Sequence, residues 1–427
     1  MADPGVARDP RLSRQTQASA TGPRGEDGCV RALLLENVHP DAADLLRGAG
    51  IEVETVRGAL PGELLVERLT GVQLLGIRSK TSLDESVLAS ADDLLAVGAF
   101  CIGTNQIDLP TASRRGVAVF NAPFSNTRSV VEMALAEMIA LTRRLTEKSA
   151  ALHEGRWEKS ADGAHEMRGR CLGIIGYGNI GSQLSVLAEA LGLRVVFYDT
   201  ADKLALGNAQ RCSTLEELLS LSDVVTLHVD GRAGNAGLFT AEQFARMRPG
   251  SVFLNLSRGF VVDHAALAES IRSGHLAGAA VDVFPDEPHA SGDPFDSDLR
   301  GLDNVILTPH IGGSTEEAQQ DIGRYVAGKL RSYITTGSTT MSVNMPPIAL
   351  PHPLGKHRVA HVHRNVPGVL ATVNRILAEH QVNVEGQLLS TSGDLGYVLT
   401  DVGSDLADSA LDSLRIMPET IRLNVLS

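Results

Sequence analysis

Short apolar stretches alternate along the chain with stretches in which apolar residues recur every three or four positions. The short runs indicate buried strands, and the longer recurrence indicates amphipathic helices. In the first third of the chain, strands are predicted at residues 30–35, 51–56, 73–77, 94–98 and 117–120. Strands and helices that alternate at this spacing are typical of an α/β domain, which we expect over roughly residues 30–125.

The same alternation continues after a loop at residues 121–129. Ser129 with Glu132 has the spacing of a capping box, which predicts a long helix around residues 129–154, and Thr240 with Gln243 predicts another helix start. Further strands are predicted at residues 172–175, 194–198, 224–228, 251–255, 279–283 and 304–308. We expect them to form a doubly wound parallel sheet with helices on both faces.

The last part of the chain has a different order of elements. Strands are predicted at residues 357–363, 382–389, 396–402 and 420–426, with helices at residues 367–378 and 406–414. This β-α-β-β-α-β order is the ferredoxin-like arrangement. The predicted organisation is a disordered tail over residues 1–29, a first domain over 30–125 and 313–345, a second domain over 126–312, and this module over 355–427.

Composition excludes several classes of protein. The net charge of −13 disfavours a nucleic-acid-binding protein, which needs a basic face. The four cysteines have no C-x-x-C spacing, so we expect no zinc site and reduced thiols in the cytoplasm. No apolar run is long enough to span a bilayer, and the tail has no apolar segment typical of a secretory signal.

A glycine-rich turn follows the strand predicted at residues 172–175. Gly176, Gly178 and Gly181 have the spacing G-x-G-x-x-G, and a helical pattern begins directly after them. Such a turn lets a pyrophosphate approach the backbone at a helix N-terminus. Asp199 ends the next strand, where a carboxylate accepts hydrogen bonds from a ribose diol and repels a 2′-phosphate. The motif therefore predicts a Rossmann-type domain that binds NAD rather than NADP.

Three polar residues follow later strands of the same predicted sheet. They are Arg258, Glu287 and His310, and ligands of parallel sheets bind at the carboxyl ends of strands. Arg258 would hold a substrate carboxylate, and His310 would take the hydroxyl proton as hydride leaves for NAD. Glu287 would orient the imidazole and favour its protonated form. Each residue alone could equally be an ordinary surface or loop residue, but together they favour oxidation of a 2-hydroxy acid.

Several segments resemble the D-2-hydroxyacid dehydrogenases. They are Cys101-Ile-Gly-Thr-Asn-Gln, Asn121-Ala-Pro-Phe-Ser-Asn-Thr-Arg-Ser-Val, Leu256-Ser-Arg-Gly and Thr308-Pro-His-Ile-Gly-Gly-Ser. The resemblance runs from about residue 31 to the C-terminus. It implies a flavodoxin-like first domain, a Rossmann-type NAD domain and a C-terminal ACT-type regulatory domain, with Arg258, Glu287 and His310 as the catalytic set. The cofactor-contacting positions that it implies are Gly176, Gly178, Asn179, Ile180, Gly181, Asp199, Leu256, Ser257, Arg258, Asp282, His310, Ile311, Gly312 and Gly313.

Within the family, the resemblance is to the branch that oxidises 3-phosphoglycerate in the first step of serine synthesis. It implies a phosphate site formed by Arg78, Ser79, Lys80 and Asn126, and a homotetrameric cytoplasmic enzyme. The family more often has Arg where Lys80 stands, and Lys lacks the bidentate geometry of a guanidinium. An equally good interpretation of residues 78–81 is a solvated basic turn that binds no phosphate.

The C-terminal module resembles ACT domains that bind L-serine. His363, Asn365 and Asn383 match the serine-binding positions of this branch, and their amide and imidazole groups suit a zwitterionic amino acid. Arg364 stands where an acid is more usual. The alternative is a dimerisation module without a ligand.

Two other functions remain open from the sequence. One is a reductase for glyoxylate or hydroxypyruvate, and reduction of 2-oxoglutarate is a plausible side activity. The other is a non-catalytic protein that senses NAD, which the acidic composition and the ACT-like module argue against.

Overall fold

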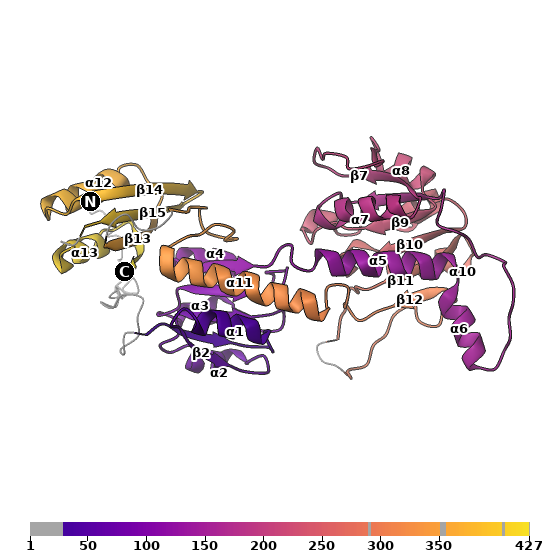
Figure 1. Ribbon diagram of the computed structural model, residues 1–427, viewed down its shortest axis with the longest axis horizontal. Coiled ribbons are helices and arrows are strands. Elements are labelled where there is room, and N and C mark those ends of the chain that lie inside the picture. Colours follow the sequence, from indigo (N-terminus) through magenta and orange to yellow (C-terminus); the bar gives the residue numbers. More distant parts are fainter. Residues whose placement is uncertain (1–28, 289–291, 351–355, 404–405, 427) are drawn as a thin grey trace, which may run out of the picture. The chain divides into compact units, whose positions relative to one another are not determined.

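The computed structural model describes residues 29–288, 292–350, 356–403 and 406–426 (Figure 1). The predicted disordered tail lies outside the described residues except for Cys29. The chain divides into two compact units. One contains residues up to 122 together with those from 323 onward, and the other contains residues 123–322.

The first domain is a parallel sheet with helices around it. Its strand order is β2-β1-β3-β4-β5, which is the flavodoxin-like order and confirms that prediction. The strands are β1 (Arg31–Leu34), β2 (Glu52–Thr55), β3 (Leu74–Ile77), β4 (Ala96–Ala99) and β5 (Ala118–Asn121). The helices are α1 (Pro40–Arg47), α2 (Gly62–Arg68), α3 (Glu85–Ala89) and α4 (Leu109–Arg114).

A long helix, α11 (Glu316–Thr336), returns the chain to this domain. Figure 1 shows the helix in orange beside the indigo elements of the first domain. Its residues Val326 and Leu330 lie so close to Gly98 in β4 that a Cβ atom there would be within 3 Å of both side chains. The glycine therefore allows the helix to pack tightly on the sheet.

The second unit contains a seven-stranded parallel sheet, as expected for a Rossmann-type domain. Its order is β12-β11-β10-β9-β6-β7-β8, so the order in which strands are added to the sheet reverses between β6 and β9, which run parallel. The strands are β6 (Cys171–Ile175), β7 (Arg194–Tyr198), β8 (Gln210–Arg211), β9 (Val224–Leu227), β10 (Ser251–Asn255), β11 (Leu276–Val281) and β12 (Val305–Leu307). The helices are α5 (Thr127–Thr142), α6 (Leu145–His153), α7 (Asn179–Ala190), α8 (Leu215–Leu221), α9 (Ala241–Arg246) and α10 (His264–Arg272), with 3-10 turns at Ala233–Asn235 and Gly259–Val261. A ligand of this sheet is expected where the strand order reverses.

The helix predicted around residues 129–154 is two helices, and that prediction was wrong. Arg144 has a left-handed backbone (φ 52°) and separates α5 from α6. The carbonyls of Leu141 and Thr142 accept hydrogen bonds from Asn304 Nδ2 and His165 N, which lie outside the helix. Because these acceptors are satisfied elsewhere, the helix ends without continuing into α6.

Of the two helix starts predicted from capping boxes, one is confirmed and one is wrong. Thr240 and Gln243 form the expected capping box. The Ser129 prediction was wrong, because α5 begins two residues earlier and the Ser129 hydroxyl bonds that of Thr315 instead. Trp157, the single tryptophan of the chain, is 81% exposed.

The C-terminal module is an antiparallel sheet with the order β14-β15-β13-β16, which confirms the ferredoxin-like prediction. The strands are β13 (His357–Arg364), β14 (Val384–Ser392), β15 (Leu395–Val402) and β16 (Thr420–Leu426). Helices α12 (Val369–Glu379) and α13 (Asp408–Arg415) share one apolar core with the strands.

Two arginines hold this module against neighbouring segments of the first unit. The guanidinium of Arg422 donates hydrogen bonds to the carbonyls of Asp92, Leu94 and Arg115 in the first domain. Arg358 forms a buried bidentate ion pair with Asp401 and also donates to the carbonyl of Thr336 at the end of α11. These charge-assisted bonds satisfy backbone acceptors that no strand or helix satisfies.

Among the described residues, no helix combines the length and apolar character needed to cross a bilayer.

Candidate active site

The glycine turn after β6 has the geometry of an anion-binding helix start. Gly176 has a left-handed backbone (φ 91°), and a Cβ atom there would lie 2.5 Å from the carbonyl oxygen of His228. A Cβ atom on Gly181 would overlap the carbonyl of Gly176, whereas one on Gly178 would have no neighbour within 4 Å. The free N–H groups of α7 begin at Asn179, so a phosphate can approach the backbone beside Gly178.

Asp199 follows β7 and is bonded to this turn. Its Oδ2 accepts a hydrogen bond from Tyr177 N and its Oδ1 accepts one from Ala201 N, both at 2.8 Å. The Tyr177 ring is buried and stacks on Phe197, with 3.8 Å between ring centroids. The acid predicted to bind a ribose therefore also ties the glycine turn to the end of β7.

Asp282 follows β11 and organises the turn that carries His310. Its carboxylate accepts hydrogen bonds from Ile311 N and Gly312 N, each at 2.8 Å, and from the Thr308 hydroxyl at 2.6 Å. Its carbonyl accepts a further bond from His310 N. His310 has a left-handed backbone (φ 54°), which is uncommon for a residue with a side chain. The structure thus joins these predicted cofactor positions into one hydrogen-bonded group.

His310 and Glu287 lie in direct contact. Glu287 Oε2 is 2.9 Å from His310 Nδ1, and Glu287 Oε1 accepts a hydrogen bond from Phe284 N. A carboxylate only accepts, so Nδ1 carries the proton and Nε2 is the nitrogen left for a substrate.

The pair shifts the titration of both groups. The hydrogen bond that His310 donates to Glu287 raises the pKa of His310, against the opposing effect of burial. Burial acts to raise the pKa of Glu287, but the hydrogen bond and charge of His310 outweigh it and the pKa is lowered. The arrangement favours a protonated imidazole beside an ionised carboxylate.

Arg258 stands beside this pair. Its Nη1 donates to the carbonyl of Ser257, and its own carbonyl accepts from Asn255 Nδ2. The next residue, Gly259, packs against the backbone of Phe284, three residues before Glu287, and a Cβ atom there would overlap it. The charge of Arg258 contributes to lowering the pKa of Glu287.

Asn126 lies at the His310 turn. Its Nδ2 takes the space that a side chain on Gly313 would need, and its Oδ1 is buried without a hydrogen-bond partner in the described structure.

Arg78, Ser79 and Lys80 form a loop in the first domain, in the other unit of the chain. Ser79 and Lys80 are exposed and Arg78 is half-buried. In the described part of the chain, neither cationic side chain has an ion-pair partner. The loop therefore presents two cationic side chains that form no ion pair with a described acid.

The predicted regulatory residues lie on and near the C-terminal sheet. His363 is buried in β13, with Nδ1 bonded to the carbonyl of Arg364 and Nε2 unpartnered in the described structure. Asn365 Nδ2 donates to the carbonyl of Gly393, and Asn383 is exposed. The Arg364 guanidinium donates to the carbonyl of Pro418.

Comparison with known proteins decides the family. The model described as "D-isomer specific 2-hydroxyacid dehydrogenase, NAD binding domain" matches residues 135–312, and an "AHAS small subunit-like ACT domain" matches residues 359–422. The chain is 50% identical over 401 residues to D-3-phosphoglycerate dehydrogenase of Escherichia coli K12, which covers 93% of this chain and 97% of that relative. The chain belongs to the D-isomer-specific 2-hydroxyacid dehydrogenase family.

Other relatives agree. D-3-phosphoglycerate dehydrogenase 1 of Saccharomyces cerevisiae is 48% identical over 389 residues, which is 88% of this chain and 82% of that relative. The crystal structure of the TT0316 protein from Thermus thermophilus has a TM-score of 0.64 and 32% identity, over 70% of this chain and 96% of that chain. The chain is an NAD-dependent oxidoreductase, as predicted, and its last module is an ACT-type domain.

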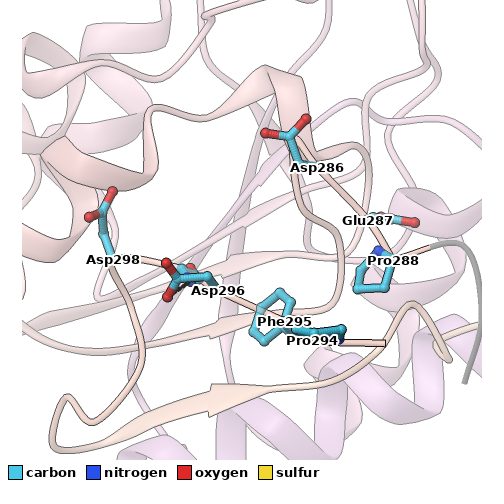
Figure 2. A pocket seen from close by; sticks show the side chains of 8 residues that line it. Asp286, Glu287, Pro288, Pro294, Phe295, Asp296 and Asp298 are labelled. Atoms are coloured by element: carbon cyan, nitrogen blue, oxygen red, sulfur yellow. Dashed lines mark hydrogen bonds between the residues drawn. The ribbon is translucent and has the colours of Figure 1, made fainter. Parts of the chain in front are cut away.

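An acidic pocket lies beside Glu287 in this dehydrogenase (Figure 2). Its lining consists of Asp286, Glu287, Pro288, Pro294, Phe295, Asp296, Ser297 and Asp298. These described residues include no basic side chain, so the pocket does not suit an anionic 2-hydroxy acid. Arg258, whose charge acts on both members of the His310–Glu287 pair, supplies the cationic group that this pocket lacks.

Three residues of the dehydrogenase were not predicted from the sequence. Burial, with the charge of Asp282 second, raises the pKa of Glu137 in α5 to about 8. Burial lowers the pKa of His228, directly after β9, to about 4. Glu36 follows β1 and bonds the loop that contains Arg78. His228 and Glu36 could have been found because both stand just past the end of a strand, as the other site residues do.

Replacing Glu287 by Gln tests the ionic character of its pair with His310. The variant removes the charge that raises the pKa of His310, so the pKa should fall. Oxidation needs a neutral imidazole and reduction a protonated one, so both pH–rate limbs should move to lower pH. Reduction at neutral pH should slow about tenfold or more.

Measurement of kcat against pH in both directions checks this expectation. Asp286→Asn, which removes a neighbouring exposed charge with no bond to His310, is the matched control. Identical pH limbs in the wild type and Glu287→Gln would contradict the assignment.

Proposed function

We propose that this dehydrogenase oxidises D-3-phosphoglycerate to 3-phosphohydroxypyruvate with NAD, as the first step of L-serine synthesis. The observation that carries the proposal is the loop with Arg78 and Lys80, whose charges have no ion-pair partner in the described part of the chain. On the alternative interpretation, this loop is only a solvated basic turn and binds no substrate. The names of the relatives favour phosphate binding, because those that the chain matches over most of their length are named D-3-phosphoglycerate dehydrogenase.

The residues of the NAD domain supply the acid–base chemistry. NAD, when bound, accepts the hydride, and the residues assigned to hold it are those of the glycine turn, Asp199 and the segments around Leu256–Arg258, Asp282 and His310–Gly313. Arg258 binds the carboxylate of the substrate through charge-assisted hydrogen bonds. His310 Nε2 takes the proton from the C2 hydroxyl, because Nδ1 is bonded to Glu287. Glu287 stabilises the imidazolium that results.

Phosphate recognition separates this reaction from that of other 2-hydroxyacid dehydrogenases. We assign the phosphate to Arg78 and Lys80, with Ser79 and Asn126 as further hydrogen-bonding residues. The same cations would also attract a second carboxylate, so we propose weaker reduction of 2-oxoglutarate as a side activity.

A substrate panel tests the assignment. NADH-dependent reduction of phosphohydroxypyruvate should exceed that of hydroxypyruvate in kcat/KM by about a hundredfold or more, because two charge-assisted contacts are lost without the phosphate. Arg78→Met should lower this preference. Arg57→Met, an exposed arginine of the same domain, should leave it unchanged.

The other functions have their own outcomes in this panel. Equal rates on phosphohydroxypyruvate and hydroxypyruvate would indicate a hydroxypyruvate or glyoxylate reductase. NADH binding without turnover of any 2-oxo acid would indicate an NAD-sensing protein.

We further propose that L-serine inhibits the enzyme by binding the ACT-type module. The buried Nε2 of His363 has no partner in the described structure, and the exposed Asn365 and Asn383 have polar atoms to spare. An unpartnered buried polar atom is costly unless a ligand or water satisfies it.

Asn365→Ala should raise the serine concentration for half-inhibition about tenfold, as expected for loss of one or two hydrogen bonds to a charged ligand. Inhibition curves with L-serine measure this. Asn374→Ala, an exposed residue of α12 in the same module, should keep the wild-type curve. A wild type that L-serine leaves fully active would refute the regulatory role.

We propose that copies of the chain associate as a homotetramer. Leu145, Leu152 and Trp157 are exposed apolar residues on and after α6, at 48%, 55% and 81%. Light scattering should give about four times the chain mass of 45.2 kDa; a monomer mass would refute association.

A further inference from the structure

A buried glutamate lies directly after the first strand of the chain. Glu36 is 8% exposed, and it and Asn37 both have left-handed backbones (φ 63° and 53°). Residues with side chains seldom adopt this conformation, and two in succession are rarer. The N–H of Glu36 donates a hydrogen bond to the carbonyl of Gly58 at 3.2 Å. The surrounding structure therefore holds Glu36 in an unfavourable backbone conformation, as is common at functional sites.

The Glu36 carboxylate is bonded to three backbone N–H groups of the loop that follows β3. Oε1 accepts from Arg78 N at 3.2 Å and from Thr81 N at 2.8 Å. Oε2 accepts from Lys80 N at 2.9 Å. The loop is fixed from its other side by Gln106, whose Nε2 donates to the carbonyl of Arg78 at 2.6 Å.

These bonds decide which groups of the loop remain for a ligand. The N–H groups of Arg78, Lys80 and Thr81 are used by Glu36, so they are not available to an anion. What remains is the N–H of Ser79 and the side chains of Arg78, Ser79 and Lys80. An anion must then be held mainly by these side chains, and their directions depend on the backbone that Glu36 fixes.

We infer that Glu36 is a positioning residue for recognition of the substrate phosphate, acting through the backbone of residues 78–81. The inference rests on the proposed function, because it presumes that Arg78 and Lys80 hold a phosphate. A carboxylate suits this role better than an amide. A Gln at this position could accept only through one oxygen, and its NH₂ group would face an N–H donor of the loop.

Glu36→Gln tests the role with little change in size. The full-length enzyme is assayed for NADH-dependent reduction of phosphohydroxypyruvate and of hydroxypyruvate. We expect KM for phosphohydroxypyruvate to rise at least about tenfold with a much smaller change in kcat, and the preference for the phosphorylated substrate to fall in proportion. Glu63→Gln, an exposed acid in α2 of the same domain, is the control and should keep both values.

A role in stability alone would lower the active fraction and so reduce kcat on both substrates equally, with the preference unchanged. That result overturns the inference. If Glu36→Gln does not fold, Glu36→Asp is measured by the same criterion, since its shorter side chain keeps the charge but cannot reach all three N–H groups.

The two proposals fail in different ways. A wild type without preference for the phosphorylated substrate overturns the proposed function and this inference with it. A wild type with the preference, and a Glu36→Gln variant that keeps it, overturns only the role of Glu36.

Discussion

The carboxylate of Asp282 holds the turn of His310, the residue to which we assign the acid–base chemistry. It accepts hydrogen bonds from Ile311 N, Gly312 N and the Thr308 hydroxyl, and the Asp282 carbonyl accepts one from His310 N. Without these bonds, a residue with a side chain would not be expected to keep the left-handed conformation of His310. That conformation sets the imidazole beside Glu287 with Nε2 left for the substrate.

The same device recurs in both units of the chain. Asp199 after β7 accepts from Tyr177 N in the glycine turn, and Glu36 after β1 accepts from three N–H groups of the Arg78 loop. In each case the carboxylate of an acid just past a strand end accepts hydrogen bonds from backbone N–H groups of a neighbouring loop. No strand or helix supplies an acceptor for these N–H groups. Charge-assisted bonds to backbone N–H are about twice as strong as neutral ones, so one side chain can fix several loop residues. Rigid loops at the strand ends let a ligand bind without first ordering the chain.

Much of the fold could be predicted from the sequence, because local signals agreed. Strands β7, β10 and β16 form at the predicted residues. Glycines such as Gly48 and Gly192 mark where the neighbouring elements end. The break at Arg144 could not be predicted, because it depends on hydrogen bonds from the distant Asn304 and His165.

Some residues of the candidate site could likewise be predicted from the sequence, and the contacts between distant residues could not. The rule that ligands bind at strand ends picked out Arg258, Glu287 and His310, and the structure places Glu287 and His310 in contact. The bonds made by Asp282 and Glu36 join residues 26 to 45 positions apart, and a single sequence carries no signal for such pairing. Asp282 was noticed through family resemblance alone, and Glu36 not at all.

Fixation of the catalytic turn by a strand-end carboxylate can be measured directly. Amide hydrogen exchange of residues 308–313 is compared between the wild type and Asp282→Asn. Loss of one charge-assisted acceptor should speed exchange at Ile311 or Gly312 by about tenfold or more, alongside a fall in kcat. Exchange in Asp282→Asn that matches the wild type would contradict this role of Asp282.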